Sequence, residues 1–339
     1  MLFRSIVSGK INNGNHRKLS DSYNEIVVDL ENDDFDITNL LHYYIQIKNG
    51  PTSSKAEITV FFKDITDDTI RKLLEYFEIV QNFKKKYNVL FSLIHSLFNR
   101  KQLWPLIYGS LLYCKNNDNN NQDRYIELFN FILMFSFLEL NLLNHSPGGV
   151  HKRIINKYII EVSNNGVKKM PENFIVDELK SELENIRLDS KIIKENFSSL
   201  DDKLKKSLFV YYFYINNKSV ELSLEKINLE HIFPQKPNSE WMENGWKINE
   251  LKNDPIHSFG NLILLNDKLN KKIKNGFIDK KIPEIKKFTD QTLMNFNMNK
   301  VDWDRFKTHK FDYIEERSNK IIEELQEMPY LKGLLSLLK

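Results

Sequence analysis

Apolar residues recur at helical spacing through the first half of the chain. Beyond a polar segment at residues 1–35, Leu40, Leu41 and Tyr44 begin an apolar stripe that Gly50 ends. The same spacing continues to about residue 163, so we interpret residues 36–170 as a bundle of helices. The individual helices are predicted over 36–50, 67–87, 89–98, 103–115, 123–144 and 148–163. Asp67 or Asp68 can cap the second of them.

The helical pattern is interrupted near Pro171, where we place the boundary of a second domain at residues 171–339. Two further helices are predicted there, over 177–187 and 201–216. Ser199 or Asp201 can cap the second of these helices, because a side-chain oxygen just before a helix accepts from its first free N–H groups.

Short strand-like segments appear beyond residue 217. They precede a predicted helix at 267–275, and a final amphipathic helix is predicted at 312–325. The order of strand, long polar loop, strand and helix is typical of a compact ββα unit. We therefore expect a mainly α protein, in which a helical bundle precedes a ββα unit, with its core at 220–290, embedded in helices. The strand-like segments are 220–222, 227–230 and 262–265.

Composition limits the class of protein. The chain has 339 residues, 41% of them hydrophobic, which is enough for two or three modules with their own cores. Its 49 basic and 46 acidic residues nearly balance, so a nucleic-acid surface would have to be a local patch. Cys114 is the single cysteine, which excludes an intramolecular disulfide and fits a reducing cytosol. The sequence shows no signal peptide, so we expect a cytoplasmic protein.

The most apolar segment is residues 125–143. It contains Glu127, Asn130, Glu139 and Asn141, and each of these side chains is costly in lipid hydrocarbon. We therefore interpret the segment as a buried helix of the bundle and expect no membrane as a partner.

Residues suited to phosphodiester hydrolysis gather around the predicted ββα unit. Glu230 and His231 lie at a strand end, Asn261 lies in a turn 30 residues after the histidine, and Asn270 lies 9 residues further on a helix. An imidazole ordinarily titrates near neutral pH, so His231 suits a general base, while Asn270 offers a carbonyl oxygen to a hard ion. Glu230 points to the opposite face of a regular strand, but at a strand end its carboxylate can turn towards a metal.

Each of these residues also has an ordinary explanation. A Glu-His pair is usually a surface feature, Gly260 with Asn261 forms a turn dipeptide, and an asparagine on a helix is usually solvated. Their joint order and spacing, in a region of changed secondary structure, favours a functional site.

Several separated motifs resemble one nuclease family. Residues 230–234 read Glu-His-Ile-x-Pro, residues 260–265 read Gly-Asn-Leu-x-Leu-Leu, and Asn270 follows. This set resembles the HNH (His-Asn-Asn) signature and, more narrowly, the C-terminal nuclease domain of GmrSD-type, modification-dependent restriction endonucleases. The resemblance covers about residues 217–326. Further segments that fit the pattern are 256–259, 275–277, 280–281 and 314–317.

The resemblance implies a reaction and roles for the residues. The family has a ββα-metal fold, in which His231 would be the general base, while Glu230 and Asn270 would hold Mg²⁺ or Mn²⁺. Asn261 would brace the loop that faces the histidine. The substrate would be DNA, and the reaction would be metal-dependent hydrolysis of phosphodiester bonds in modification-dependent restriction or phage defence.

Basic and aromatic residues surround the motif. A lysine cluster can neutralise phosphates without reading sequence, although in a Lys-rich protein it is often only a solvated face. Trp241 and Trp246 are expected to form a satellite core rather than to stack on bases. His257 is either a second imidazole ligand, a phosphate-binding group or a structural hydrogen-bonding residue. The candidate nucleic-acid-binding residues are Lys268, Lys271, Lys272, Lys274, Lys280 and Lys281.

The helical domain resembles the connector of the same large proteins through residues 36–50, the helix that contains Tyr76 and Tyr87, and residues 103–107. That connector normally follows an N-terminal ParB-like nucleotide-hydrolysing domain, but this sequence has no Asp-Gly-Gln-Gln-Arg stretch and no phosphate-binding Gly loop. We therefore expect a separate nucleotide-hydrolysing subunit, loss of that half, or a fragment. Two alternatives stay open: a non-catalytic helical interaction subunit that needs such a partner, and an RNase.

Overall fold

The structure is a computed structural model, and its described residues are mostly helical, which confirms the prediction of a mainly α protein. The chain divides into two compact units. Unit 1 consists of residues 1–91, 98–140 and 144–186, and unit 2 consists of residues 187–339 with two short segments, 92–97 and 141–143. The structure describes residues 28, 37–49, 66–98, 104–117, 122–143, 150–165, 171–183, 189–217, 227–246, 255–287 and 296–338.

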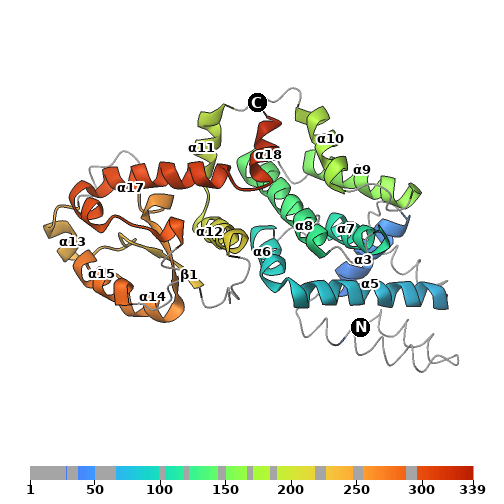
Figure 1. The fold of residues 1–339 in the computed structure, drawn as a ribbon, viewed down its shortest axis with the longest axis horizontal. Coiled ribbons are helices and arrows are strands. Elements are labelled where there is room, and N and C mark those ends of the chain that lie inside the picture. The colour runs from blue at the N-terminus through green and yellow to red at the C-terminus, as the bar shows by residue number, and fades with distance from the viewer. Residues whose placement is uncertain are drawn as a thin grey trace. The chain divides into compact units, whose positions relative to one another are not determined.

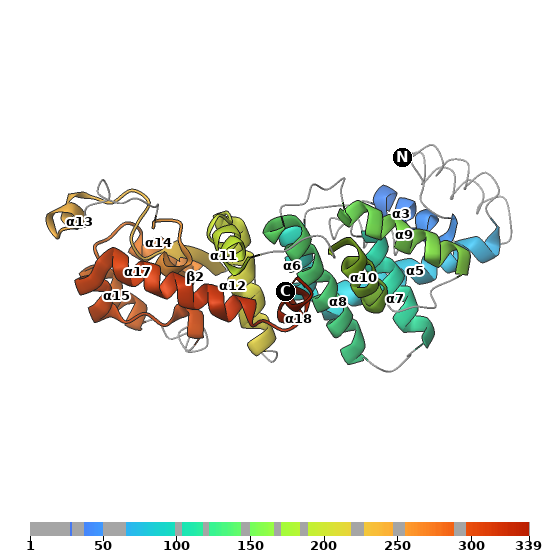
Figure 2. The ribbon, with the colours of Figure 1, turned by 90° about the horizontal axis from the view of Figure 1, so that it is seen from above.

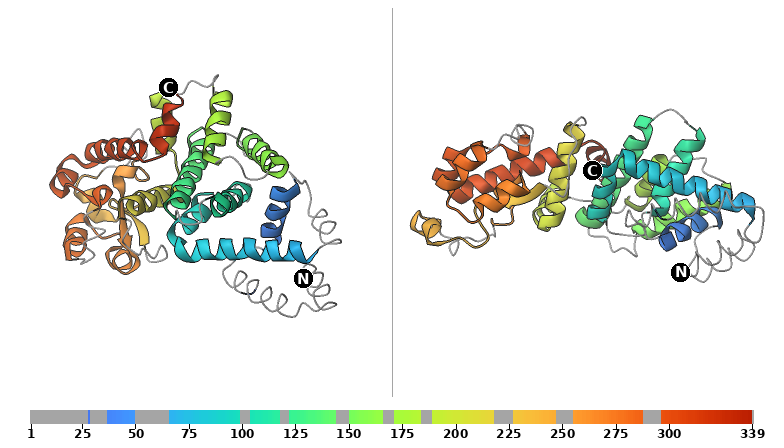
Figure 3. Two further views of the ribbon diagram at one scale, coloured as in Figure 1. Left: turned by 45° about the vertical axis from the view of Figure 1, so that its right-hand side comes forward. Right: turned by 90° about the horizontal axis from the view of Figure 1, so that it is seen from below.

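Unit 1 is a bundle of helices (Figure 1). Its helices are α3 (Ile37–Asn49), α5 (Asp67–Lys86), α7 (Trp104–Asn117), α8 (Gln122–Phe137), α9 (Val150–Asn165) and α10 (Pro171–Leu183), and α6 (Asn88–Phe98) begins in this unit. Helix α7 packs against α3, α5, α8, α9 and α10, and Figure 3 shows the bundle from two other sides. Leu106, Ile107, Tyr108 and Leu111 of α7 are all buried, as is typical of a helix enclosed by others.

The apolar segment at 125–143 is part of this packing. Helix α8 continues into a π-helical turn, η2 (Leu138–Leu142), and Asn130 and Glu139 are buried with their apolar neighbours. Among the described residues, no helix has both the length and the apolar character needed to span a membrane.

The ends of several helices differ from the sequence predictions. Thr66, rather than Asp67 or Asp68, caps α5, because its hydroxyl accepts from the Thr69 N–H at 3.3 Å. Pro171 begins α10 rather than interrupting a helix, since the first helical position needs no N–H donor. Asp201 caps the helix at 202–216, as predicted, by accepting from the Leu204 N–H at 2.7 Å.

Unit 2 joins helices to a two-stranded sheet (Figure 2). The predicted strand at 220–222 lies outside the described residues. Helices α11, α13, α15 and α18 and the 3₁₀ turns were not predicted. The elements are α11 (Ser190–Ser198), α12 (Asp202–Asn216), β1 (Ile227–His231), α13 (Ser239–Glu243), η5 (Phe259–Asn261), β2 (Leu262–Asn266), α14 (Asp267–Ile273), α15 (Ile278–Lys287), η6 (Asn297–Asn299), α17 (Trp303–Gln326) and α18 (Leu331–Ser336).

The two strands pair antiparallel, with Ile227 opposite Asn266 and His231 opposite Leu262. Directly opposed residues share a face, so Ile263 and Leu265 share the face of Glu230, and Leu262 shares that of His231. Ile263 and Leu265 belong to a core cluster with apolar residues of α14, α15 and α17. Helix α12 packs against both strands. Glu230 and His231 therefore project from opposite faces of the sheet.

Trp241 on α13 and Trp246 are core residues, as predicted, and belong to the cluster that covers the sheet. Trp241 and Trp246 are buried and contact each other edge to face, with ring centroids 5.3 Å apart. Phe233, two residues beyond β1, stacks on Trp246 with centroids 5.0 Å apart. The chain that leaves the histidine is therefore anchored by aromatic packing.

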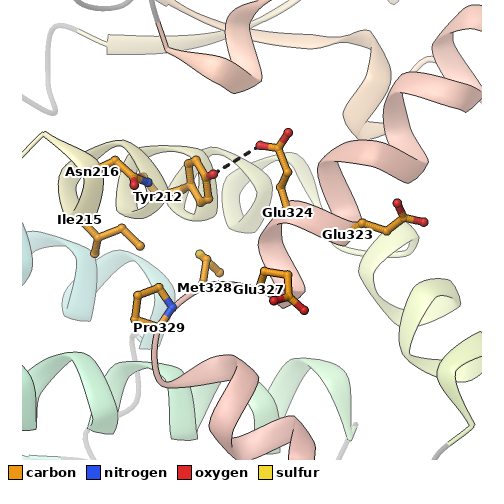
Figure 4. A pocket seen from close by; sticks show the side chains of 8 residues that line it. All are labelled: Tyr212, Ile215, Asn216, Glu323, Glu324, Glu327, Met328 and Pro329. Carbon is orange, nitrogen blue, oxygen red and sulfur yellow. Dashed lines mark hydrogen bonds between the residues drawn. The ribbon is translucent and has the colours of Figure 1, made fainter.

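Helix α17 contains a kink that explains the late start of the predicted final helix. Lys310 has a φ of +47° inside the helix, so the predicted helix at 312–325 lies wholly after the kink. Near the end of α17, a surface pocket forms against α12, where the Tyr212 hydroxyl donates to the Glu324 carboxylate at 3.3 Å (Figure 4). The pocket is lined by Tyr212, Ile215, Asn216, Glu323, Glu324, Glu327, Met328 and Pro329.

Candidate active site

Asn261 fixes the chain on either side of the histidine. It is fully buried, and its amide oxygen accepts from the Phe233 N–H at 2.7 Å. Its amide nitrogen donates to the carbonyls of Phe233 and Ile256, both at 2.8 Å. The Ile232 N–H donates to the Asn261 carbonyl at 2.8 Å. The side chain thus connects the residues that follow β1 to the loop that precedes η5.

Gly260 and Arg317 hold the turn that carries Asn261 against α17. A Cβ on Gly260 would lie 1.8 Å from the Ile314 carbonyl oxygen, so only glycine allows this approach. The buried guanidinium of Arg317 donates to the carbonyls of Gly260 at 2.5 Å, Leu262 at 3.1 Å and Met298. Burial lowers the pKa of Arg317 to about 10, which still leaves it charged at neutral pH. An arginine on the helix therefore satisfies carbonyls that the turn leaves without partners.

His231 ends β1 in a largely buried position, with 13% of its side chain exposed. Its Nε2 atom lies 3.4 Å from Asp202 Oδ2, and the Gln235 amide nitrogen lies 3.4 Å from the same Nε2 atom. Burial lowers the pKa of His231 to about 4, nearby positive groups add to this effect, and Asp202 opposes it. The imidazole is therefore neutral at pH 7, as a general base must be before it accepts a proton.

Asp202 and His257 complete a cluster around His231. Asp202 is the first residue of α12, and its carboxylate oxygens lie 3.0 and 3.1 Å from His257 Nδ1. The rings of His231 and His257 meet edge to face, with centroids 5.3 Å apart. One donor atom from each of the three side chains lies within 4.8 Å of the others. This is a donor set that can hold a metal ion.

Glu230 lies elsewhere, on the opposite face of the sheet. Its Oε1 atom accepts from Lys281 Nζ at 2.7 Å, and this ammonium also donates to the carbonyls of His231 at 2.9 Å and Ile232 at 3.2 Å. Burial raises the pKa of Glu230 and lowers that of Lys281, while each partner opposes the shift of the other. The structure therefore gives Glu230 a lysine partner and does not bring it into the cluster of Asp202, His231 and His257.

Asn270, the second expected metal ligand, lies on α14 beside Leu269, which belongs to the core cluster. Its amide oxygen is buried and has no hydrogen-bond partner among the described residues. An unpartnered buried carbonyl oxygen is costly in a folded protein, and a hard cation can satisfy it.

The expected nucleic-acid-binding lysines fall into two groups. Lys281 departs from the expectation, because its side chain is fully buried and its ammonium binds Glu230, so it cannot reach a phosphate in this fold. The others are exposed, and three of them form surface ion pairs: Lys271 with Asp267, Lys272 with Glu284 and Lys280 with Glu240. Such exposed pairs contribute little stability and can open when a phosphate approaches.

The residues of this site lie in a part of the chain that matches a known protein family. Residues 182–324 match the family described as GmrSD restriction endonucleases, C-terminal domain. The region is a GmrSD-type C-terminal nuclease domain. No curated protein matches the chain. The GmrSD domain includes all three members of the His-Asp cluster, and also Asn261, Asn270 and the sheet.

Sequence reasoning missed two residues of the GmrSD domain that bear on the site. Asp202 follows a capping aspartate at the start of a helix and comes 29 residues before His231, so no local pattern connects the two. Lys205, on the next turn of α12, is buried and donates to the His257 carbonyl at 2.6 Å. The one available signal was a charged residue at a position of α12 that should face the core.

Proposed function

We propose that the GmrSD domain is a metal-dependent DNA endonuclease of the HNH type, in which His231 accepts the proton of the attacking water. One observation carries the proposal: a domain of a restriction endonuclease family holds a neutral, largely buried imidazole at the end of a strand. The order β1, β2 and α14 is that of a ββα unit, which supports the HNH assignment.

The chain's own residues support each part of proton transfer. Two side-chain hydrogen bonds join Asn261 to Phe233, just after His231, and a third joins it to the Ile256 carbonyl, so the ring keeps its place at the strand end. When the ring takes a proton from water, it becomes an imidazolium, and the Asp202 carboxylate 3.4 Å from Nε2 stabilises that charge. The reaction therefore begins with a neutral base and ends with an ion pair.

The metal expected from the family would use oxygen ligands near the helix α14. Asn270 fits this role, since its amide oxygen is buried without a partner among the described residues. Glu230 fits less freely, because an ion there would compete with the Lys281 ammonium for its carboxylate. A bound Mg²⁺ or Mn²⁺ supplies positive charge that offsets the charge developing on the phosphate and on the leaving oxygen.

Binding of DNA would use exposed positive charge near the motif. Lys268 and Lys274 are exposed on α14 and at its end, and Lys271, Lys272 and Lys280 lie nearby in surface ion pairs. Contacts from lysine to phosphate position a duplex but carry no sequence information. The expected recognition is therefore of the DNA backbone, with affinity that falls as salt increases.

A nicking assay tests this proposal directly. Supercoiled plasmid with and without modified bases, and a matched RNA, are incubated with the full chain in Mg²⁺ or Mn²⁺. We expect DNA cleavage that His231→Ala reduces at least a hundredfold and that EDTA abolishes. His309→Ala is the matched control, because His309 is an exposed histidine of the same unit. Equal cleavage by the His231→Ala variant and the wild type would contradict the proposal, as would cleavage of RNA alone.

A further inference from the structure

Three side chains from separate elements place metal-binding atoms around one point. Asp202 comes from the first turn of α12, His231 from the end of β1 and His257 from the loop before η5. Asp202 Oδ2 lies 3.0 Å from His257 Nδ1 and 3.4 Å from His231 Nε2. All three donor atoms lie within 4.8 Å of one another.

These separations suit a single ion. With metal–ligand bonds of about 2.0–2.2 Å, ligand atoms lie about 2.8–3.6 Å apart when they occupy adjacent positions of an octahedron or tetrahedron. Both Asp202 separations already fall in this range. The donor atoms of His231 and His257 lie within 4.8 Å of each other, and the His257 ring can adjust to an ion because 46% of its side chain is exposed.

The chemistry of the donors selects the kind of ion. Two imidazole nitrogens and one carboxylate suit Zn²⁺, Co²⁺ or Ni²⁺, whereas Mg²⁺ prefers oxygen ligands and retains its waters. The imidazoles bind a metal through a ring nitrogen that carries no proton. The loop that carries His257 is held in place, since Lys205 donates to the His257 carbonyl and Asn261 donates to the Ile256 carbonyl.

We propose that Asp202, His231 and His257 form a binding site for a divalent transition-metal ion such as Zn²⁺, distinct from the oxygen site expected for Mg²⁺. An ion bound here is coordinated by the lone pair of the His231 imidazole, so this nitrogen can no longer accept a proton. If His231 is the general base, a consequence that rests on the proposed function, occupancy of this site inhibits cleavage.

Direct binding tests the site without reference to activity. The full chain, freed of metal by EDTA and dialysis, is titrated with Zn²⁺ by calorimetry and with Co²⁺ by visible absorption. We expect one ion per chain, with affinity reduced at least tenfold in His257→Ala and in Asp202→Asn. His257 is half exposed, so its replacement should leave the fold intact. Asn270→Ala and His309→Ala serve as controls and should retain the affinity of the wild type.

Different results would overturn the metal site, its inhibitory role and the proposed function. Absence of binding by the wild type, or equal affinity in the His257→Ala variant, would overturn the site and indicate an adventitious ion only. For the inhibitory role, Zn²⁺ is added to cleavage supported by Mg²⁺, and His257→Ala should need at least tenfold more Zn²⁺ for half inhibition. Stimulation of the wild type by Zn²⁺ would refute inhibition. Zn²⁺ binding by a wild type that cuts no DNA would contradict only the proposed function.

Discussion

The buried pair of Glu230 and Lys281 makes the stability of unit 2 sensitive to one lysine. The side chain of Lys281 is fully buried and that of Glu230 is 14% exposed, with Nζ and Oε1 2.7 Å apart. Lys281→Met would leave the Glu230 carboxylate without its partner and two carbonyls without a donor. Removing one member of a buried ion pair typically costs about 3–5 kcal/mol, so we expect a loss of that size in the free energy of unfolding.

The neighbouring lysine provides a matched control. Lys280 forms an ion pair with Glu240 at 2.8 Å, but 70% of its side chain is exposed. An exposed pair contributes about 1 kcal/mol or less, so Lys280→Met should be nearly neutral. The double variant Glu230→Gln with Lys281→Met removes both charges, and we expect it to be more stable than Lys281→Met alone.

Urea unfolding followed by tryptophan fluorescence measures these differences. Three of the four tryptophans, Trp241, Trp246 and Trp303, lie in unit 2, so the signal reports mainly on the unit that contains the pair. A loss below about 1 kcal/mol for Lys281→Met, or equal losses for the two lysines, would refute the reasoning that burial makes this pair structural. It would also restore Lys281 as a candidate phosphate contact.

Three further predictions follow from the geometry of the site. His231 has a pKa of about 4 when folded and an ordinary value of 6.5, so the unfolded chain binds the proton more readily. The free energy of unfolding should therefore fall by on the order of 2–3 kcal/mol as pH decreases from about 6.5 to 4. His231→Gln in EDTA should remove this dependence, and an unchanged slope of the free energy of unfolding against pH in that variant would contradict the lowered pKa of His231. Gly260→Ala should lower the free energy of urea unfolding by about 3 kcal/mol or more, because the added Cβ would clash with Ile314. Gly333 has open space around it, so Gly333→Ala should stabilise its helix by up to about 1 kcal/mol. Equal effects of the two substitutions would be inconsistent with the close approach of Gly260 to Ile314. Asn261→Ala should lose about 3 kcal/mol, because two buried backbone groups of Phe233 and the partly buried Ile256 carbonyl lose their partner. A thermal melt unchanged from wild type would show that the loops hold without it.

Local patterns in the sequence determined much of the fold. Apolar spacing located α3, α5 and the helix at 202–216, because a helix that buries one face must repeat about every 3.6 residues. The strand-like segments at 227–230 and 262–265 located both strands. Shorter helices such as α11 and α18 escaped prediction, since two turns carry too few periodic positions.

The family resemblance located the nuclease region, and with it His231, Asn261 and Asn270. It could not show which side chains meet across the fold. Glu230 and His231 are neighbours in the chain, yet strand geometry turns them to opposite faces of the sheet, one to Lys281 and the other to Asp202. A lysine cluster read from the sequence likewise divides into exposed residues and one buried partner of a carboxylate.

Only the tertiary structure decided the composition of the site. Asp202 and His257 reach His231 because α12 packs on the sheet and because Arg317 and Gly260 hold the turn of Asn261 against α17. These contacts join segments that lie 26 or more residues apart, so they leave no trace in periodicity or spacing. The sequence by itself specified the elements and the candidate base, while long-range packing selected the carboxylate and second imidazole that surround it.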